Sequence, residues 1–340
     1  MPFKLTNQIK YKLRSTRPSQ TIGDYEDRYW LTQGGDLEKE SEYRDFTELY
    51  YDLVTDFYNY GWGESFHFAP RVPGESFAAS LVRHEHFLAD ALKLEPGMVV
   101  ADLGCGIGGP MLEIARYSGA KIVGVNINAY QLERARTSAQ RAALGHLTEF
   151  IHCDFLQVDA PDESFDAVYA IEATCCAPDK VSVYGEVLRL LKPGGVFGNY
   201  EYCLTDKFDV KDPHHLRIKT DIQLGGGLLD IDYRSTVDDA LRTVGFDVLE
   251  TRDLAVQTGP SIPWYQPLIG SGLSIAGFRR SSLGRWVTQN SLRVMEQLRI
   301  TPQGSTRVAE ALNRCGDAMV EAGRLGIFTP MYFIHARKPE

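Results

Sequence analysis

A glycine-rich loop directly after a short apolar run constrains the fold of this chain more than any other feature. The run is Val99-Val-Ala-Asp-Leu, and the loop continues it as Asp102-Leu-Gly-Cys-Gly-Ile-Gly-Gly-Pro. The run has the composition of a buried strand, and the proline suits the first turn of a helix. The first two glycines let the backbone approach a ligand closely, and the last two ease the turn into the helix. This succession predicts a nucleotide-binding α/β domain.

Strand and helix patterns alternate on both sides of this loop. We therefore predict an α/β fold with a doubly wound, mostly parallel seven-stranded sheet. About 80 residues separate the last two strands, mostly helical in pattern from Ser282 to Leu325. Because this insertion is too long for a simple connection, we expect a helical cap over the open edge of the sheet, inserted before the last strand. The predicted strands are 99–103, 121–126, 149–152, 165–171, 195–200, 246–250 and 331–337.

Size, composition and charge narrow the class of protein. The 340 residues are 44% hydrophobic and 24% charged, as in ordinary globular proteins, and the net charge of −9 argues against a nucleic-acid partner. Six cysteines without metal-ligand spacing indicate reduced thiols in a cytosolic setting. His84 and His86 do not share a helical face, so we expect no metal site.

No segment has the pattern of a signal peptide or of a membrane span. The first residues lack a signal peptide's apolar core, and no run approaches about 18 apolar residues. We expect a cytoplasmic protein, and peripheral contact with the endoplasmic reticulum or lipid droplets stays open.

Polar residues at the ends of three predicted strands favour S-adenosyl-L-methionine over a nicotinamide cofactor. Asp102 precedes the first loop glycine, where a carboxylate can hold the ammonium of the methionine moiety. Asn126-Ile-Asn128 ends the second strand, where a partner for the ribose hydroxyls belongs. An acidic residue is commoner at position 126, but an amide also hydrogen-bonds a hydroxyl. Cys153-Asp-Phe155 follows the third strand and suits the adenine. We therefore predict a class I methyltransferase fold.

An aromatic run precedes the loop by about forty residues. Tyr58-Asn-Tyr-Gly-Trp-Gly-Glu-Ser-Phe-His-Phe68 holds five aromatic rings and a histidine in eleven residues, and helical spacing from Asp45 to Tyr60 leads into it. Core packing would explain the rings alone. Aromatic faces are electron-rich, however, so rings around an apolar pocket can stabilise a cation. Together with the cofactor loop, the run indicates an enzyme that forms a carbocation on a bulky lipid.

Several motifs along the chain together resemble the sterol C-24 methyltransferases, over residues 45 to 340. Besides the glycine loop, the matching motifs are Tyr60-Gly-Trp-Gly-Glu-Ser-Phe-His-Phe68, Gly74-Glu-Ser-Phe-Ala-Ala-Ser80, Arg83-His-Glu-His86, Tyr169-Ala-Ile-Glu-Ala-Thr174, Tyr200-Glu-Tyr-Cys-Leu-Thr-Asp-Lys207, Ile262-Pro-Trp-Tyr265 and Phe328-Thr-Pro-Met331. The resemblance implies methylation of a sterol side-chain alkene, at C-24, by S-adenosylmethionine. The alkene attacks the sulfonium methyl, a tertiary cation and a hydride shift follow, and a base then removes a proton.

The resemblance and the residue chemistry give a set of expected site residues. The catalytic candidates are Tyr60, Glu64, His67, Glu172 and Glu201. The expected substrate-binding residues are Tyr58, Trp62, Phe66, Phe68, Trp264 and Tyr265. The expected cofactor-binding residues are Asp102, Gly104, Cys105, Gly106, Gly108, Asn126, Asn128, Gln131, Asp154, Phe155 and Glu172.

Tyr60 is expected as a possible proton relay, and each of the other four catalytic candidates also has a rival role. Glu64 could cap a turn, His67 could be a satisfied core residue, and Glu172 or Glu201 could bind the cofactor's ammonium instead. Three parts are expected: an N-terminal helical arm with the aromatic segment over 1–80, an S-adenosylmethionine-binding Rossmann-like domain over 81–250, and a cap with the final strand over 251–340.

Three positions depart from the family's usual pattern. Asn59 stands where the family usually has Glu, Cys176 where it usually has His, and Gly225-Gly-Gly-Leu-Leu-Asp230 replaces Gly-x-Gly-Leu/Ile-Pro. The first two changes each replace a titratable group by a poor base. The hypothesis is that methyl transfer persists while the substrate or the fate of the cation differs. The alternative function is a C-methyltransferase of specialised metabolism that acts on a triterpenoid or other prenyl-derived lipid.

Two further classes stay open. A methyltransferase for small phenolic or amine substrates would not need the aromatic run. A catalytically silent scaffold would bind the cofactor without turnover of any lipid. The expected partner is a sterol or triterpenoid substrate, and self-association into a homo-oligomer also stays open.

Overall fold

The computed structural model describes residues 40–256, 262–270, 282–301 and 304–340, together with single positions between 23 and 29. Residues 1–39 of the predicted N-terminal part, apart from those single positions, therefore lie outside the described residues. The helix predicted from Asp45 to Tyr60 is confirmed as α3, Glu40–Trp62.

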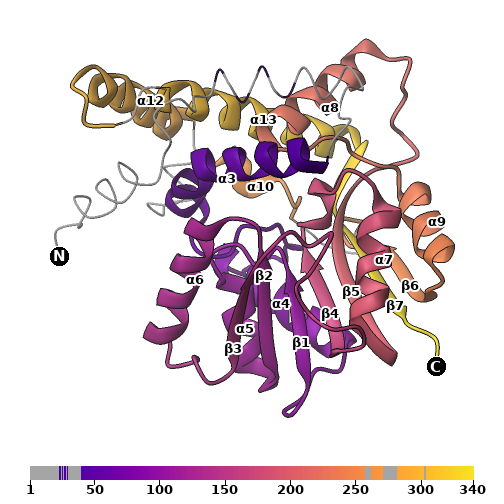
Figure 1. Cartoon of the computed structure of the whole chain (residues 1–340). Helices are drawn as coiled ribbons and strands as arrows, with labels where there is room; N and C mark the ends of the chain where they lie inside the picture. Colours follow the sequence, from indigo (N-terminus) through magenta and orange to yellow (C-terminus); the bar gives the residue numbers. More distant parts are fainter. Residues whose placement is uncertain are drawn as a thin grey trace.

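A single mixed sheet forms the centre of the molecule (Figure 1). Its order is β3-β2-β1-β4-β5-β7-β6. The first five strands of this order pair in parallel, and β7 runs antiparallel to both β5 and β6. The predicted seven-stranded, mostly parallel sheet is confirmed. The strands are β1 Val99–Leu103, β2 Lys121–Asn126, β3 Thr148–His152, β4 Phe165–Ile171, β5 Leu191–Leu204, β6 Asp247–Asp253 and β7 Phe328–Arg337.

Two apolar clusters cover the two faces of the sheet, as a doubly wound fold requires. On one face, Leu88 of α4 and Met111 of α5 pack against strand residues such as Ile122. On the other, Val183 of α7 and Leu241 of α9 pack against the same strands. The helices of these layers are α4 Phe77–Ala91, α5 Gly109–Ser118, α6 Ala129–Arg141, α7 Lys180–Leu190 and α9 Arg234–Val244.

Local sequence sets where these helices begin and end. Asn128 accepts a hydrogen bond from the Gln131 N–H at the start of α6, and Asp179 accepts one from the Ser182 N–H at the start of α7. Gly119 ends α5 in a left-handed backbone conformation, with φ of 71°, which residues with a side chain rarely adopt. Short-range capping signals therefore mark the starts of α6 and α7 and the end of α5.

A cap of helices lies across the carboxyl ends of the parallel strands (Figure 1). The prediction that it covers the open edge of the sheet was wrong. Since β7 begins at Phe328 opposite Leu204, the last residue of β5, the chain before β7 must lie at that end of the sheet. The described cap helices are α3, α8 Pro213–Gly226, α10 Gln266–Ile269, α12 Ser282–Gln297 and α13 Ser305–Leu325.

Helix α8 belongs with the cap by its packing, although its residues fall in the predicted 81–250 range. A Cβ on Gly225 would come 2.8 Å from the Ala311 carbonyl oxygen of α13 and would also overlap Cys315. Gly227, with φ of 69°, lies against the ring of Tyr50 on α3. The three-glycine segment that departs from the family pattern is thus where three cap helices meet. The division of the chain into three domains stays a prediction.

Candidate active site

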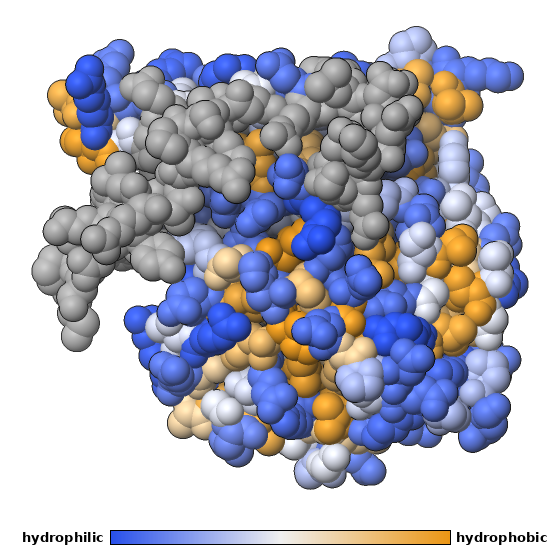
Figure 2. Space-filling view, viewed as in Figure 1, coloured by the Kyte–Doolittle hydropathy of each residue, from blue (hydrophilic) through white to orange (hydrophobic). Residues whose placement is uncertain are grey.

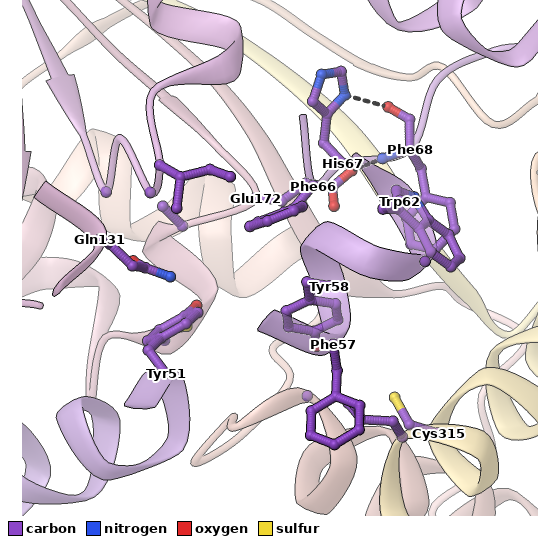
Figure 3. A pocket seen from close by; sticks show the side chains of 18 of the residues that line it. Tyr51, Phe57, Tyr58, Trp62, Phe66, His67, Phe68, Gln131, Glu172 and Cys315 are labelled. Carbon is purple, nitrogen blue, oxygen red and sulfur yellow. Dashed lines mark hydrogen bonds between the residues drawn. The ribbon is translucent and has the colours of Figure 1, made fainter. Parts of the chain in front are cut away.

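A cavity of about 300 Å³ lies between the carboxyl ends of the strands and the cap (Figure 3). From the sheet side, the glycine loop, the end of β2 and the end of β4 contribute to its lining. From the cap side, α3, α12 and α13 contribute. In Figure 3, Glu172 and Cys315 lie on opposite sides, with Phe57 and Tyr58 between them. The lining is mostly apolar and aromatic, so the cavity fits a lipid better than a polar metabolite.

The glycine loop leaves open space on the sheet side. Gly104 has φ of 78°, and a Cβ there would overlap Ala173 at the end of β4. Gly106 has φ of 54°, and no atom of the described chain lies within 4 Å of the position a Cβ would take. Both conformations are ones that side chains rarely adopt. The loop backbone is therefore exposed to the cavity at the point where a ligand would approach it.

The end of β2 carries an amide network beside the loop. The Asn126 side chain donates to the Gln131 side-chain oxygen at 2.8 Å and to the Gly106 carbonyl at 3.2 Å. Gln131 in turn donates to the hydroxyl of Thr55 on α3 at 2.9 Å. Asn126 and Gln131 line the cavity, whereas Asn128 caps α6 and donates to Asp52 of α3. These bonds tie the cap helix α3 to the predicted ribose-binding region.

The predicted carboxylates around the cofactor lie behind the cavity surface. Asp102 is buried and accepts a hydrogen bond from Tyr169, its partner on β4, at 3.1 Å. Burial raises the pKa of Asp102 to about 7, against that hydrogen bond. Asp154 is also buried and accepts from the Leu156 N–H, while Phe155 beside it lines the cavity. Gly108 likewise lies behind the surface, against Ala135. The roles of these residues in cofactor binding stay predictions.

All five rings of the aromatic run line the cavity, and Figure 3 labels four of them, all except Tyr60. Tyr58 and Phe66 have ring centroids 5.5 Å apart, and Trp62 meets the edge of Phe68 at 5.9 Å. The Glu64 carbonyl passes so close to Gly109 that a Cβ would overlap it, so the run crosses the start of α5. The side chains of Glu64 and Tyr60 are exposed at the cavity.

Trp264 and Tyr265, predicted to bind substrate, do not line the cavity. Trp264 packs edge-on against Phe68 at 5.0 Å, and Tyr265 packs against Trp264 at 5.5 Å. These two rings therefore support the aromatic wall from behind. A role in direct substrate contact stays a prediction.

Glu172 is held in a strained position at the end of β4. Its φ is 53°, a left-handed conformation that costs energy in a residue with a side chain. One carboxylate oxygen accepts from the Phe68 N–H at 2.7 Å, and the other accepts from the Tyr202 hydroxyl at 2.8 Å. Burial raises the pKa of Glu172 to about 7, although His67 and both hydrogen bonds lower it. The side chain lines the cavity and can take up or release a proton near neutral pH.

His67 faces a hydrogen-bond acceptor with each ring nitrogen. Nδ1 lies 2.8 Å from the Phe68 carbonyl, and Nε2 lies 2.9 Å from the Glu85 carboxylate. Only the imidazolium donates from both nitrogens. Burial lowers the pKa of His67, but Glu85 and Glu172 oppose it and the net shift is upward. The two acceptors and the upward net shift of its pKa favour the protonated ring of His67 beside Glu172, and both ring nitrogens are engaged by these contacts.

Comparison with known proteins decides the family. A sterol methyltransferase C-terminal model matches residues 275–340, and a methyltransferase domain model matches residues 101–198. Cycloartenol-C-24-methyltransferase of Arabidopsis thaliana is 44% identical over 99% of both chains. The chain belongs to the sterol 24-C-methyltransferase family. The sterol 24-C-methyltransferase of Saccharomyces cerevisiae is 42% identical over 92% of this chain and 85% of the relative.

Solved structures confirm the class I methyltransferase fold. A mycolic acid cyclopropane synthase aligns with a TM-score of 0.68 over 87% of this chain and 98% of that one, at 16% identity. A geranyl diphosphate C-methyltransferase from Streptomyces coelicolor aligns with a TM-score of 0.61 over 87% and 97%, at 18% identity.

As a sterol methyltransferase family member, the chain is an S-adenosyl-L-methionine-dependent enzyme, and its residues fit that cofactor. The open space at Gly106 admits a ligand against the loop backbone, beside the amides of Asn126 and Gln131. Phe155 and Ile127 add apolar surface on the same side. These residues would hold the cofactor, which would supply an electrophilic methyl group to the cavity.

Glu201, a predicted catalytic residue, is buried beneath the cavity floor and not in it. Its carboxylate accepts from Thr174 at 2.5 Å and from Tyr184 at 3.1 Å, and Lys180 lies 3.6 Å away. Lys180 also donates to the Thr174 carbonyl at 2.8 Å. Burial lowers the pKa of Lys180, but Glu201 opposes it and the net shift is upward. The pair clamps the short turn Thr174–Cys176, which presents Cys175 and Cys176 to the cavity.

Sequence reasoning missed three residues of this sterol methyltransferase site. Glu85 and Tyr202 contact the catalytic candidates, and both lie inside motifs that the resemblance had already singled out. Cys315 lies on the cap helix α13 and lines the cavity, and the helical periodicity of the sequence did not indicate which face of that helix meets the cavity. The Tyr51 hydroxyl lies 3.4 Å from the Cys176 sulfur. Such pairings across more than a hundred residues leave no local signal.

Proposed function

We propose that this enzyme transfers a methyl group from S-adenosyl-L-methionine to the side-chain alkene of a sterol, at C-24, through a carbocation intermediate. The names of the relatives and the mostly apolar cavity support a sterol substrate. The observation that carries the proposal is the position of Glu172. A carboxyl with a pKa of about 7 lies between the glycine loop and a wall of aromatic rings.

The chain's own residues supply orientation and a cation-tolerant surface. When bound, S-adenosylmethionine supplies an electrophilic methyl group. The loop and the aromatic run would hold the alkene in line with it and exclude water, because an alkene is a weak nucleophile. The electrons of the π bond would form the new C–C bond to the methyl carbon while the methyl–sulfur bond breaks and its electron pair goes to sulfur. A tertiary cation is then left on the lipid. Phe66, Phe68 and Trp62 face the cavity and stabilise this cation by about 0.5–2 kcal/mol for each well-placed ring, without capturing it.

Glu172 is the base in this proposal. After a hydride shift, its carboxylate takes the proton from the carbon next to the cation, and the C–H electron pair becomes the new alkene. The Phe68 N–H and the Tyr202 hydroxyl fix the carboxylate's direction. The cationic His67, held by Glu85, keeps part of the Glu172 population ionised despite its burial. Holding the cofactor's ammonium is the alternative role of Glu172.

Product analysis tests the reaction. The purified enzyme is incubated with methyl-labelled cofactor and a Δ24 sterol, and the products are identified by mass spectrometry. We expect one label per turnover and a 24-methylated product with a relocated double bond. An aza-analogue of the cation should bind more tightly than the substrate, since it resembles the high-energy intermediate. Cofactor binding without turnover of any lipid would contradict the proposal.

The family departures favour a second candidate, an altered substrate or an altered fate of the cation. Cys176 lines the cavity, and a hydrogen bond with Cys175 lowers the pKa of its thiol. The thiol is smaller than the imidazole usual in the family. A triterpenoid or other prenyl-derived lipid would then be the substrate of a specialised-metabolism enzyme. Efficient conversion of an ordinary Δ24 sterol to its 24-methylene product would contradict this second candidate. If the second candidate is correct, Cys176→His should change the ratio of the products.

The place of action follows from the proposed substrate. Among the described residues no helix is both long and apolar enough to cross a bilayer. Because a sterol resides in membranes and lipid droplets, we also propose a cytoplasmic enzyme that works at the surface of the endoplasmic reticulum or of lipid droplets. Self-association of two copies of the chain is the competing possibility for any exposed surface that would contact the membrane.

A further inference from the structure

Helix α12 exposes a row of large apolar side chains along one side. Leu283, Trp286 and Val294 are 61%, 62% and 54% exposed, and Val287 lies between them on the same side. Their spacing of three, four and seven residues places them in one stripe of the helix. Just after the helix, Leu298 is 65% exposed. Surface helices of globular proteins normally turn such a stripe toward the core, so this one indicates a binding surface.

The opposite side of the same helix lines the cavity. Arg285, Thr288 and Gln289 contribute to the cavity lining, and Arg285 pairs with Asp317 of α13 at 2.7 Å. One helix therefore separates the substrate cavity from the exposed row. Helix α12 lies in the layer farthest from the body of the sheet (Figure 1), and apolar surface shows at that end of the molecule beside the grey residues (Figure 2).

The charge around α12 is opposite to that of the whole chain. Residues 279–314 contain seven arginines and two glutamates, although the chain has a net charge of −9. Arg293 flanks the exposed row, is itself exposed and pairs with Glu310 of α13 at 3.1 Å. An amphipathic helix with a tryptophan, branched apolar residues and neighbouring arginines suits the interface of an anionic bilayer. A face-to-face pair of copies would instead bring two arginine-rich surfaces together.

We propose that the exposed row of α12 and its neighbouring arginines dock on an anionic lipid bilayer, with the helix lying in the interface. The lipid substrate then enters the cavity past α12 without crossing bulk water. This inference rests on the proposed function, because it assigns the source from which that lipid substrate comes. A second copy of the chain is the competing occupant.

Vesicle flotation of the full chain tests the docking surface. The vesicles are phosphatidylcholine alone or phosphatidylcholine with 30% phosphatidylserine. We expect binding mainly to the anionic vesicles, weakened by high salt. The variant Trp286→Ser/Val294→Ser/Leu298→Ser should bind about tenfold or more weakly, because it removes the apolar contribution. The variant Val210→Ser changes a valine outside α12 that is 61% exposed, against 54% for Val294. This variant should bind the vesicles like the unmodified chain.

Measurements of turnover in two sterol preparations distinguish failure of the docking surface from failure of the proposed function. With a Δ24 sterol dispersed in detergent, the triple variant should turn over at the same rate as the unmodified chain. With the sterol embedded in anionic vesicles, its turnover rate should fall by about the same factor as its vesicle binding. Equal vesicle binding by the variant and the unmodified chain would overturn the docking surface, as would a dimer that the variant splits without any loss of vesicle binding. Absence of detergent turnover in the unmodified chain, with vesicle binding intact, would count against the proposed function alone.

Discussion

The two walls of the cavity are built in different ways. The loop wall consists of residues 104–107, the end of β2 and residues 171–173. It rests on strands whose register places Leu103 beside both Val125 and Ala170. The cap wall consists of the cavity-facing residues of α3, α8, α12 and α13. Its helices meet through close contacts such as Gly225 against Ala311 and through hydroxyl bonds such as Tyr50 to the Gly225 carbonyl.

The loop wall therefore mainly governs the reaction, whereas the cap wall mainly governs the shape of the lipid that fits. Hydrogen bonds of the parallel sheet fix the loop wall, and buried charges stand directly behind it, so its atoms are well placed for reaction. The cap wall is held by packing and by small residues, so changes there alter which lipid fits more readily than what the enzyme does to it. Mutations in the two walls should therefore have separable effects.

The largest effect is expected at Glu172 in the loop wall. Glu172→Gln keeps the size of the side chain but removes the base, so kcat should fall by about 10²–10⁴-fold. Cofactor affinity, measured by calorimetry, should change little. Glu64→Gln is the matched control, because Glu64 also lines the cavity but is exposed. A large loss of cofactor affinity with kcat retained would show that Glu172 holds the cofactor's ammonium instead.

Removing a buried charge behind the loop wall should mainly reduce stability. Lys180→Met leaves Glu201 buried without its cation and should lower the free energy of unfolding by about 3–5 kcal/mol. Lys192→Met is the control, since Lys192 pairs with Asp166 near the surface and should cost less than about 1 kcal/mol. Denaturant titration measures both. The double change Lys180→Met/Glu201→Gln should recover part of the loss, and no recovery would argue against the clamp.

A methyl group added in the cap wall tests its close packing. Gly225→Ala should cost about 1–3 kcal/mol, because its Cβ would meet α13. At the next position, the nearest atom to an added Cβ is 3.4 Å away, on Leu228, so Gly226→Ala should be neutral or slightly stabilising in the helix. Equal melting temperatures for the two variants would contradict the packing described at this junction.

The pH dependence of the reaction gives the smallest expected effect. Glu172 must be ionised to accept a proton, and its pKa is about 7. Below pH 7, kcat/KM should therefore fall by up to about tenfold per pH unit. A bound cofactor cation would lower this pKa, so the fall in kcat should appear at lower pH than the fall in kcat/KM. Identical pH profiles for both parameters would argue against a bound cofactor cation beside Glu172.

Stability should change in the opposite direction over the same range. The folded state retains protons on Glu172 and Asp102 up to about pH 7, whereas the unfolded chain releases them near pH 4. Between these values the folded state binds more protons, so stability falls as pH rises toward 7. Ionised Glu172 thus costs stability while it supports the reaction.

Much of the loop wall could be predicted because its signals are local. The apolar strand, the glycine conformations and the polar strand ends lie within a few residues of one another, and parallel strands bring their carboxyl ends together. The aromatic run was found as readily, and all five of its rings line the cavity. Prediction was weaker for individual side chains: Glu201 lies behind the floor, and Trp264 lies behind Phe68.

The sequence by itself determined the class I sheet, the cofactor loop and the aromatic run, because each depends on short-range propensity and periodicity. Only the tertiary structure decided where the cap lies and which groups meet in the cavity. The antiparallel β7 returns between β5 and β6, and that topology brings the cap to the carboxyl ends of the strands. Burial and the pairing of Glu172 with Phe68 and Tyr202 then set its pKa, and such contacts between distant residues leave no periodic signal.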